Sequence, residues 1–235
     1  MKLQRIIKQN IPNTITCLNL FCGCMAIVFA FNYGETFGTL KGYELSFIFI
    51  GLAAVFDFCD GLSARLLHAY SAVGKELDSL SDLVSFGVAP AALVYNAMAV
   101  NGAGWLSYAA FLIAVLGGLR LARFNVDDRQ TSSFIGLPIP SNAIFWIGMV
   151  AWVNQHSYPG NAVMVTLIGI ISYLMVSNLR MFSLKVKTLA WKVNAHRYIL
   201  IIATIAGVTV LGVTAFAYAI ILYILMSLFA GRNEQ

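Results

Sequence analysis

Two pairs of aspartates between residues 57 and 82 are the part of this sequence best suited to chemistry. Asp57 and Asp60 are three residues apart, and Asp78 and Asp82 are four apart. On a helix, either spacing places both side chains on one face. The segment between the pairs is short enough to form two antiparallel helices joined by a brief turn, so we expect the four carboxylates to face one another.

Carboxylates that are crowded in this way cannot all ionise without cations, and divalent ions that prefer oxygen ligands are their natural partners. Mg²⁺ is commonly held by a few carboxylates together with substrate phosphates, and a pair of such ions can clamp both sides of a phosphoryl displacement. The aspartates therefore predict metal-assisted phosphoryl transfer.

Small residues accompany the aspartates and leave room for a substrate to approach the backbone. They are Gly61, Ser63, Ala64, Ser71 and Gly74. Arg65 adds a planar fork suited to a phosphate oxygen. Two other interpretations stay open. The region could be a helix-packing interface whose aspartates are neutralised by Arg65 and Lys75, or it could be a cation or proton pathway of a transporter.

The composition indicates where such a site must lie. Hydrophobic residues make up 60% of the 235 residues and charged residues 11%, against roughly a quarter charged in globular domains. A soluble fold of this size could not bury so much apolar surface. We expect an all-α integral membrane protein, with residues 1–235 forming one transmembrane domain.

Apolar runs predict about eight transmembrane helices, with seven as the alternative. The first six spans are expected at residues 14–31, 45–67, 80–100, 105–121, 144–153 with its flanks, and 162–176. As a single helix, residues 198–230 would reach about 50 Å, more than the ~30 Å hydrocarbon core. We therefore predict two C-terminal spans joined near Gly212.

Basic residues predict the orientation. With eight spans and residues 1–12 in the cytoplasm, every one of the 15 lysines and arginines except Lys41 lies on the cytoplasmic side, as the positive-inside rule requires. Residues 178–197 then form a basic cytoplasmic connection. The aspartates face the cytoplasm from an inner (plasma) membrane, so we expect membrane lipids as partners and no nucleic acid.

The segment from residue 57 to residue 82 resembles the signature of the CDP-alcohol phosphotransferase family at every defined position and spacing. It reads Asp57-x2-Asp60-Gly61-x2-Ala64-Arg65-x8-Gly74-x3-Asp78-x3-Asp82. Further matches make the chain similar to the membrane-embedded bacterial phosphatidylserine synthases within that family. They are Pro12-Asn13-x2-Thr16-x2-Asn19, Ser85-Phe86-Gly87-Val88-Ala89-Pro90, Arg120-Leu121-Ala122-Arg123-Phe124-Asn125 and Gly136-Leu137-Pro138-x-Pro140.

The resemblance implies roles for several of the matching residues. Asp57, Asp60 and Asp78 would hold a pair of divalent cations, Mg²⁺ or Mn²⁺, and Asp82 would touch one ion and act as general base. The expected CDP-diacylglycerol contacts are Asn13, Thr16, Asp60, Gly61, Ala64, Arg65, Ser71 and Gly74. The family signature leaves position 71 free.

The resemblance further implies that the phosphatidyl group of CDP-diacylglycerol passes to the hydroxyl of L-serine, with release of CMP, and that the protein is a homodimer. Glycerol 3-phosphate or inositol phosphate as the acceptor is the alternative. Arg120 and Arg123 are three residues apart, which places them on one helical face beside Asn125. We expect these three to hold the serine carboxylate or the lipid phosphate.

Overall fold

The computed structural model describes residues 2–126, 134–182 and 191–230. The described chain is almost entirely helical and divides into two compact units, one up to Val115 and one from Leu116 onward. The prediction of a single domain stays a prediction.

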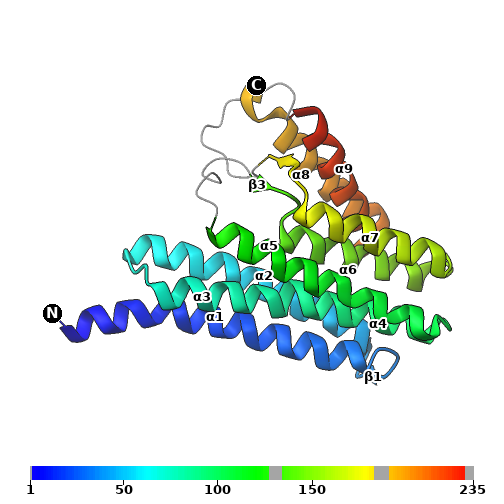
Figure 1. The fold of residues 1–235 in the computed structure, drawn as a ribbon, viewed down its shortest axis with the longest axis horizontal. Helices are drawn as coiled ribbons and strands as arrows, with labels where there is room; N and C mark the ends of the chain where they lie inside the picture. Colours follow the sequence, from blue (N-terminus) through cyan, green and yellow to red (C-terminus); the bar gives the residue numbers. More distant parts are fainter. Residues whose placement is uncertain (1, 127–133, 183–190, 231–235) are drawn as a thin grey trace. The chain divides into compact units, whose positions relative to one another are not determined.

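The first unit is a bundle assembled on its N-terminal helix, α1. In chain order its elements are α1 (Lys2–Phe31), β1 (Thr36–Phe37), β2 (Leu40–Lys41), α2 (Gly42–Leu67), α3 (Ala72–Asp82), the π-helix η1 (Leu83–Val88), α4 (Ala89–Val100) and the 3₁₀-helix η2 (Gly104–Phe111). Helices α2, α3, η1 and α4 all pack against α1 (Figure 1). Helix α1 is therefore the common support of this unit.

Local sequence explains how α2 begins and ends. Strands β1 and β2 form an antiparallel hairpin, after which the Lys41 backbone N–H donates to the Glu44 carboxylate at 2.7 Å, a capping interaction at the start of α2. The helix ends at His68, whose φ of 50° places it in the left-handed region that closes many helices. This turn separates the two aspartate pairs, as the sequence predicts.

The second unit contains the C-terminal helices. Its elements are α5 (Leu112–Val126), which begins in the first unit, β3 (Phe134–Ile135), α6 (Ile139–Gln155), α7 (Asn161–Val176), β4 (Arg180–Met181), α8 (Trp191–Leu211), the 3₁₀-helix η3 (Gly212–Thr214) and α9 (Ala215–Ala230). Helix α9 packs against α6 and α8. The buried core of the second unit includes Trp146, Phe145 and Ile168.

The break at Gly212 agrees with the sequence prediction of two C-terminal helices. Gly212 has a φ of +61°, which glycine adopts without the steric cost that other residues incur. Helix α6 begins at Ile139, within the flank that precedes residues 144–153 of the fifth predicted span. Pro140 fits within the first turn of α6, where a backbone N–H has no helical partner.

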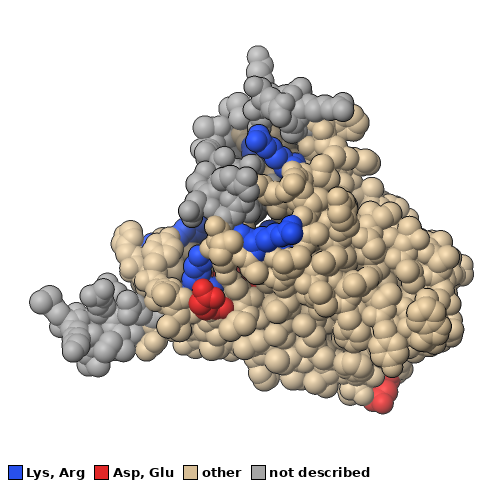
Figure 2. All heavy atoms as spheres, in the orientation of Figure 1, with Lys and Arg blue, Asp and Glu red and all other residues tan. Residues whose placement is uncertain are grey.

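The described residues contain five helical stretches that are long and apolar enough to cross a membrane. They are Asn10–Phe31, Gly42–Leu67, Ala72–Val100, Gly104–Val126 and Asn194–Phe229. Large apolar side chains such as Val210, Leu66 and Phe58 are exposed, and Figure 2 shows a surface with few charged residues. The chain is an all-α, multi-pass membrane protein. The number of spans and the side that the aspartates face stay predictions.

Candidate active site

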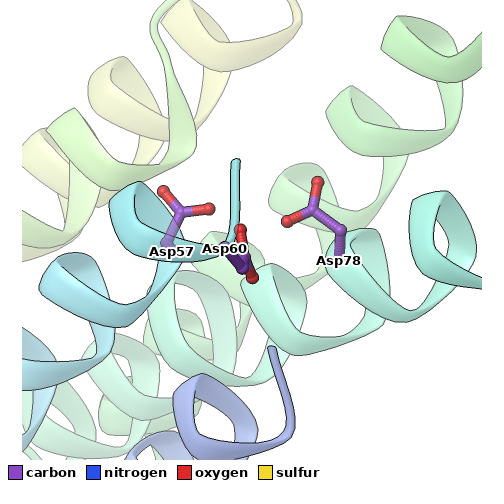
Figure 3. A group of neighbouring side chains, drawn as sticks. All are labelled: Asp57, Asp60 and Asp78. Atoms are coloured by element: carbon purple, nitrogen blue, oxygen red, sulfur yellow. The ribbon is translucent and has the colours of Figure 1, made fainter. Parts of the chain in front are cut away.

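Three aspartates converge in the first unit. Asp57 and Asp60 lie about one turn apart on α2, and the side chain of Asp78 approaches them from α3 (Figure 3). Each offers a carboxylate oxygen, and these oxygens lie within 4.8 Å of one another. The helical spacing of the sequence therefore does bring carboxylates from two helices together.

The three carboxylates fit a divalent cation. Asp60 is only 5% exposed, and its buried Oδ2 atom has no hydrogen-bond partner among the described residues. A buried carboxylate oxygen that lacks a partner destabilises the folded protein. A cation bound among the three side chains would supply that partner. Oxygen donors alone suit Mg²⁺ or Mn²⁺ rather than a softer metal.

Asp82 lies beside this cluster and has a different environment. Its carboxylate lies near that of Asp57, and its Oδ1 atom accepts a hydrogen bond from the Asn19 amide Nδ2 at 3.4 Å. The three carboxylates whose oxygens lie within 4.8 Å of one another are those of Asp57, Asp60 and Asp78, and Asp82 is not among them. Asp82 is thus placed at the edge of the cluster, held by a residue of α1.

Helix α1 also carries the other predicted residues from the first span. Thr16 is buried, its hydroxyl donates to the Pro12 carbonyl at 3.0 Å, and it interacts with the Asp60 carboxylate. Asn13 lies next to Gly74: a Cβ atom at Gly74 would be 2.9 Å from Asn13 Oδ1. Asn13 and Thr16 therefore lie near the aspartates, and their contact with the CDP group stays a prediction.

Ser71 has a structural role that the sequence did not indicate. Its hydroxyl accepts the Gly74 backbone N–H at 2.9 Å, which makes Ser71 the N-cap of α3. N-cap serines satisfy a helix N–H that otherwise has no partner. This contact explains why serine stands at a position that the family signature leaves free.

The remaining signature residues of α2 lie on its accessible side. Gly61 and Arg65 are exposed and Ala64 is partly buried. A Cβ atom at Gly61 would meet no other atom within 4 Å, so packing within the described chain does not require a glycine there. The space beside Gly61 is available to a ligand.

Arg120, Arg123 and Asn125 lie in the second unit, and their surroundings differ. Arg120 is buried, with its guanidinium 5.6 Å from the centre of the Phe124 ring. Arg123 is exposed, and its Nη1 donates to the Val176 carbonyl at 3.0 Å. The two arginines do not share the environment that their spacing suggests. Their part in substrate binding stays a prediction.

Sequence reasoning assigned no role to Asn19, Ser85 or Gly23, which connect α1 to the helix of Asp82. Ser85 donates to Asn19 Oδ1 at 2.7 Å, and Gly23 lies against Ser85. The available signal was the spacing of residues 16, 19 and 23, which puts them on one face of α1.

Comparison with known proteins identifies the family of the chain. A family model described as CDP-alcohol phosphatidyltransferase matches residues 9–179. The chain is 38% identical over 170 residues to the CDP-diacylglycerol–serine O-phosphatidyltransferase of Methanocaldococcus jannaschii, covering 72% of each chain. It is 36% identical over 170 residues to the enzyme of that name from Bacillus subtilis, covering 72% of this chain and 88% of the relative. The Helicobacter pylori protein of the same name is 33% identical over 174 residues, covering 72% and 70%.

Proposed function

The chain belongs to the CDP-alcohol phosphatidyltransferase family, and we propose that it transfers the phosphatidyl group of CDP-diacylglycerol to the hydroxyl of L-serine. The products are phosphatidylserine and CMP. The observation that carries the proposal is the convergence of Asp57, Asp60 and Asp78 from two helices, in a chain whose relatives are named for this reaction.

The aspartates supply the metal site of the proposed enzyme. Asp57, Asp60 and Asp78, with Asp82 at the edge, would hold two Mg²⁺ or Mn²⁺ ions. When bound, these ions neutralise the charge of the pyrophosphate and of the departing CMP. Asp60 in particular has a buried oxygen in need of a partner, which supports its role as a ligand.

Other residues around the aspartates would bind the nucleotide and lipid phosphates. Arg65 is exposed beside the cluster and offers two parallel donors to a phosphate. Gly61 and Ala64 leave space for the substrate along α2, while Asn13 and Thr16 contribute polar groups from α1. Ser71 and Gly74 act on this site through the start of α3.

Asp82 would act as general base. It takes the proton of the serine hydroxyl while the serine oxygen forms a bond to the phosphorus that carries diacylglycerol. The bond from that phosphorus to the CMP oxygen breaks, and CMP leaves with the electron pair. The proton goes to Asp82, so atoms and charge balance. A weakly acidic alcohol needs its base within hydrogen-bond reach, and the edge of a metal cluster suits that task.

Arg120, Arg123 and Asn125 are our candidates for holding the serine carboxylate or the lipid phosphate. Arg123 is the accessible member of the three, and an arginine can bind a carboxylate through two parallel hydrogen bonds that lysine cannot reproduce. We expect Arg123→Lys to raise the KM for serine. An unchanged KM and rate in this variant would exclude Arg123 from the serine site.

The location and assembly follow from charge and from the family. The distribution of lysine and arginine supports an inner (plasma) membrane protein whose aspartates face the cytoplasm, where serine is available. CDP-diacylglycerol would enter from the surrounding lipid. Resemblance to the family supports a homodimer. Cross-linking in native membranes, followed by mass measurement of the product, tests the assembly.

One assay separates the proposal from its alternatives. Purified protein with CDP-diacylglycerol and Mg²⁺ or Mn²⁺ is given serine, glycerol 3-phosphate or inositol phosphate, and released CMP is measured. We expect release with serine alone. Release with another alcohol would change the acceptor and keep the chemistry. If no CMP were released with any of the three alcohols, the protein would not be such a transferase, and the transporter interpretation would be favoured.

A further inference from the structure

A buried hydrogen-bond chain runs from Asp82 into the interface between α1 and η1. Asn19 Nδ2 donates to Asp82 Oδ1 at 3.4 Å. The Ser85 hydroxyl donates to Asn19 Oδ1 at 2.7 Å and approaches the Asn19 backbone carbonyl at 3.1 Å. Asn19 and Ser85 have no exposed surface. Because the Asn19 amide is buried from solvent, its hydrogen bonds to protein groups determine its orientation.

These partners determine which way the Asn19 amide faces. An ionised carboxylate can only accept hydrogen bonds, so the NH₂ group must point to Asp82 and the oxygen must point to Ser85. The reverse orientation would place two acceptors together in a buried interface, which carries a large desolvation cost. In this orientation Ser85 supplies the donor that the Asn19 oxygen requires, and so stabilises the amide that Asn19 presents to Asp82.

The backbone is shaped to allow this contact. A Cβ atom at Gly23 would overlap the Ser85 hydroxyl and lie 2.9 Å from Ser85 Cα. Only glycine lets α1 and η1 approach so closely here. The segment that carries Ser85 is a π-helix that begins directly after Asp82. Such turns are rare and are frequently found at functional sites.

We propose that Asn19 is a positioning residue for Asp82, with Ser85 and Gly23 holding the Asn19 amide in place. The inference rests on the proposed function, since it concerns the base in the proton transfer. With Oδ1 held by Asn19, the proton of the acceptor hydroxyl is taken by Oδ2. The carboxylate is thus aimed before the substrate arrives, which lowers the cost of reaching the reactive geometry.

Ser81 provides a matched control. It is as fully buried as Ser85, and its hydroxyl donates to the Thr16 carbonyl of α1 at 3.3 Å. It therefore joins α3 to α1, but no hydrogen bond within the described part of the chain links it to Asn19 or to the Asp82 carboxylate. Ser81→Ala and Ser85→Ala each remove one buried hydroxyl that donates to a residue of α1.

The test uses purified full-length protein and the variants Asn19→Ala, Ser85→Ala, Ser81→Ala and the double variant Asn19→Ala/Ser85→Ala. For each we would measure kcat, the KM values for serine and CDP-diacylglycerol, and the thermal unfolding midpoint. We expect Asn19→Ala to lower kcat roughly 10- to 100-fold, as loss of a supporting contact typically does, with the KM for CDP-diacylglycerol unchanged. Ser85→Ala should lower kcat in the same way, and Ser81→Ala should not.

The double variant tests whether Ser85 acts on Asp82 through Asn19. Because Ser85 acts through Asn19, adding Ser85→Ala to Asn19→Ala should leave kcat where Asn19→Ala put it. If the double variant instead showed the product of the two single losses in kcat, that result would overturn the proposal. So would equal losses in Ser81→Ala and Ser85→Ala, which would indicate a merely structural interface.

Failure of this inference differs from failure of the proposed function. Parental kcat in Asn19→Ala, with turnover lost in Asp82→Asn, would overturn the positioning role and keep Asp82 as the base. Parental kcat in Asp82→Asn would overturn both. If Asn19→Ala does not fold, the comparison of Ser85→Ala with Ser81→Ala decides the question by itself.

Discussion

The hydroxyl of Ser71 accepts the backbone N–H of Gly74 at 2.9 Å, so Ser71 caps the helix that carries Asp78 and Asp82. The cap fixes where α3 starts after the turn at His68. Because helix residues are related by a fixed rise and rotation, the start of α3 also sets the direction in which Asp78 faces α2.

The cap predicts how substitutions at Ser71 should behave. Ser71→Ala should lower the free energy of unfolding by about 1 kcal/mol, the usual loss for a missing N-cap side chain. Ser71→Asn, which retains a capping oxygen, should keep the stability and the KM for CDP-diacylglycerol. Thermal unfolding in detergent and steady-state kinetics measure the two quantities. A raised KM in a fully stable Ser71→Asn protein would instead support a direct contact with the nucleotide.

Gly61 and Gly74 should respond differently to alanine. At Gly74 the new methyl group would lie 2.9 Å from Asn13 Oδ1 and 2.9 Å from Ser71 Oγ. We expect a loss of stability of roughly 1–3 kcal/mol, as overpacking usually causes. At Gly61 the methyl group meets nothing within 4 Å, so stability should hold or rise by about 0.5–1 kcal/mol.

Kinetics provide the second half of that comparison. The Gly61→Ala methyl group would enter space that we assign to the substrate, so the KM for CDP-diacylglycerol should rise while the unfolding midpoint does not fall. A Gly61→Ala enzyme with parental KM would place the nucleotide elsewhere on the cluster.

The metal site predicts an effect on stability as well as on rate. Chelation should abolish turnover, and adding Mn²⁺ to the chelated protein should raise its unfolding midpoint, because a ligand that binds only the folded state stabilises it. Asp60→Asn should lose most of this shift. Glu76→Gln, at an exposed carboxylate of α3 outside the cluster, is the control and should retain it. Equal shifts in both variants would show that Mn²⁺ binds away from Asp60.

Asp82→Asn should abolish measurable turnover while much of the binding of CDP-diacylglycerol survives. Removal of a general base typically costs ~100- to 10,000-fold in rate, and asparagine has nearly the shape of aspartate but cannot take the proton. Rates come from CMP release, and binding from titration with a fluorescent CDP-diacylglycerol analogue. Near-parental turnover in the purified variant would exclude Asp82 as the base.

Several features of the site could be predicted from sequence because they are local. The spacings of three and four residues placed each aspartate pair on one helical face, and the glycines and polar residues between them indicated a turn. The break at Gly212 was predicted from length, since one helix over residues 198–230 would exceed the membrane. Sequence did not show where α6 begins, because proline is tolerated in a first helical turn and Pro140 lies in the first turn of α6.

By itself, the sequence determined that this is a helical membrane protein with an aspartate cluster and a family signature. Composition and short spacings are properties of the chain that survive in any packing of its helices. Only the tertiary structure decided which residues support the cluster. Asn19 and Asp82 are 63 positions apart, and their contact depends on the close approach of α1 and η1 at Gly23. Such contacts arise from helix packing, which no local pattern specifies.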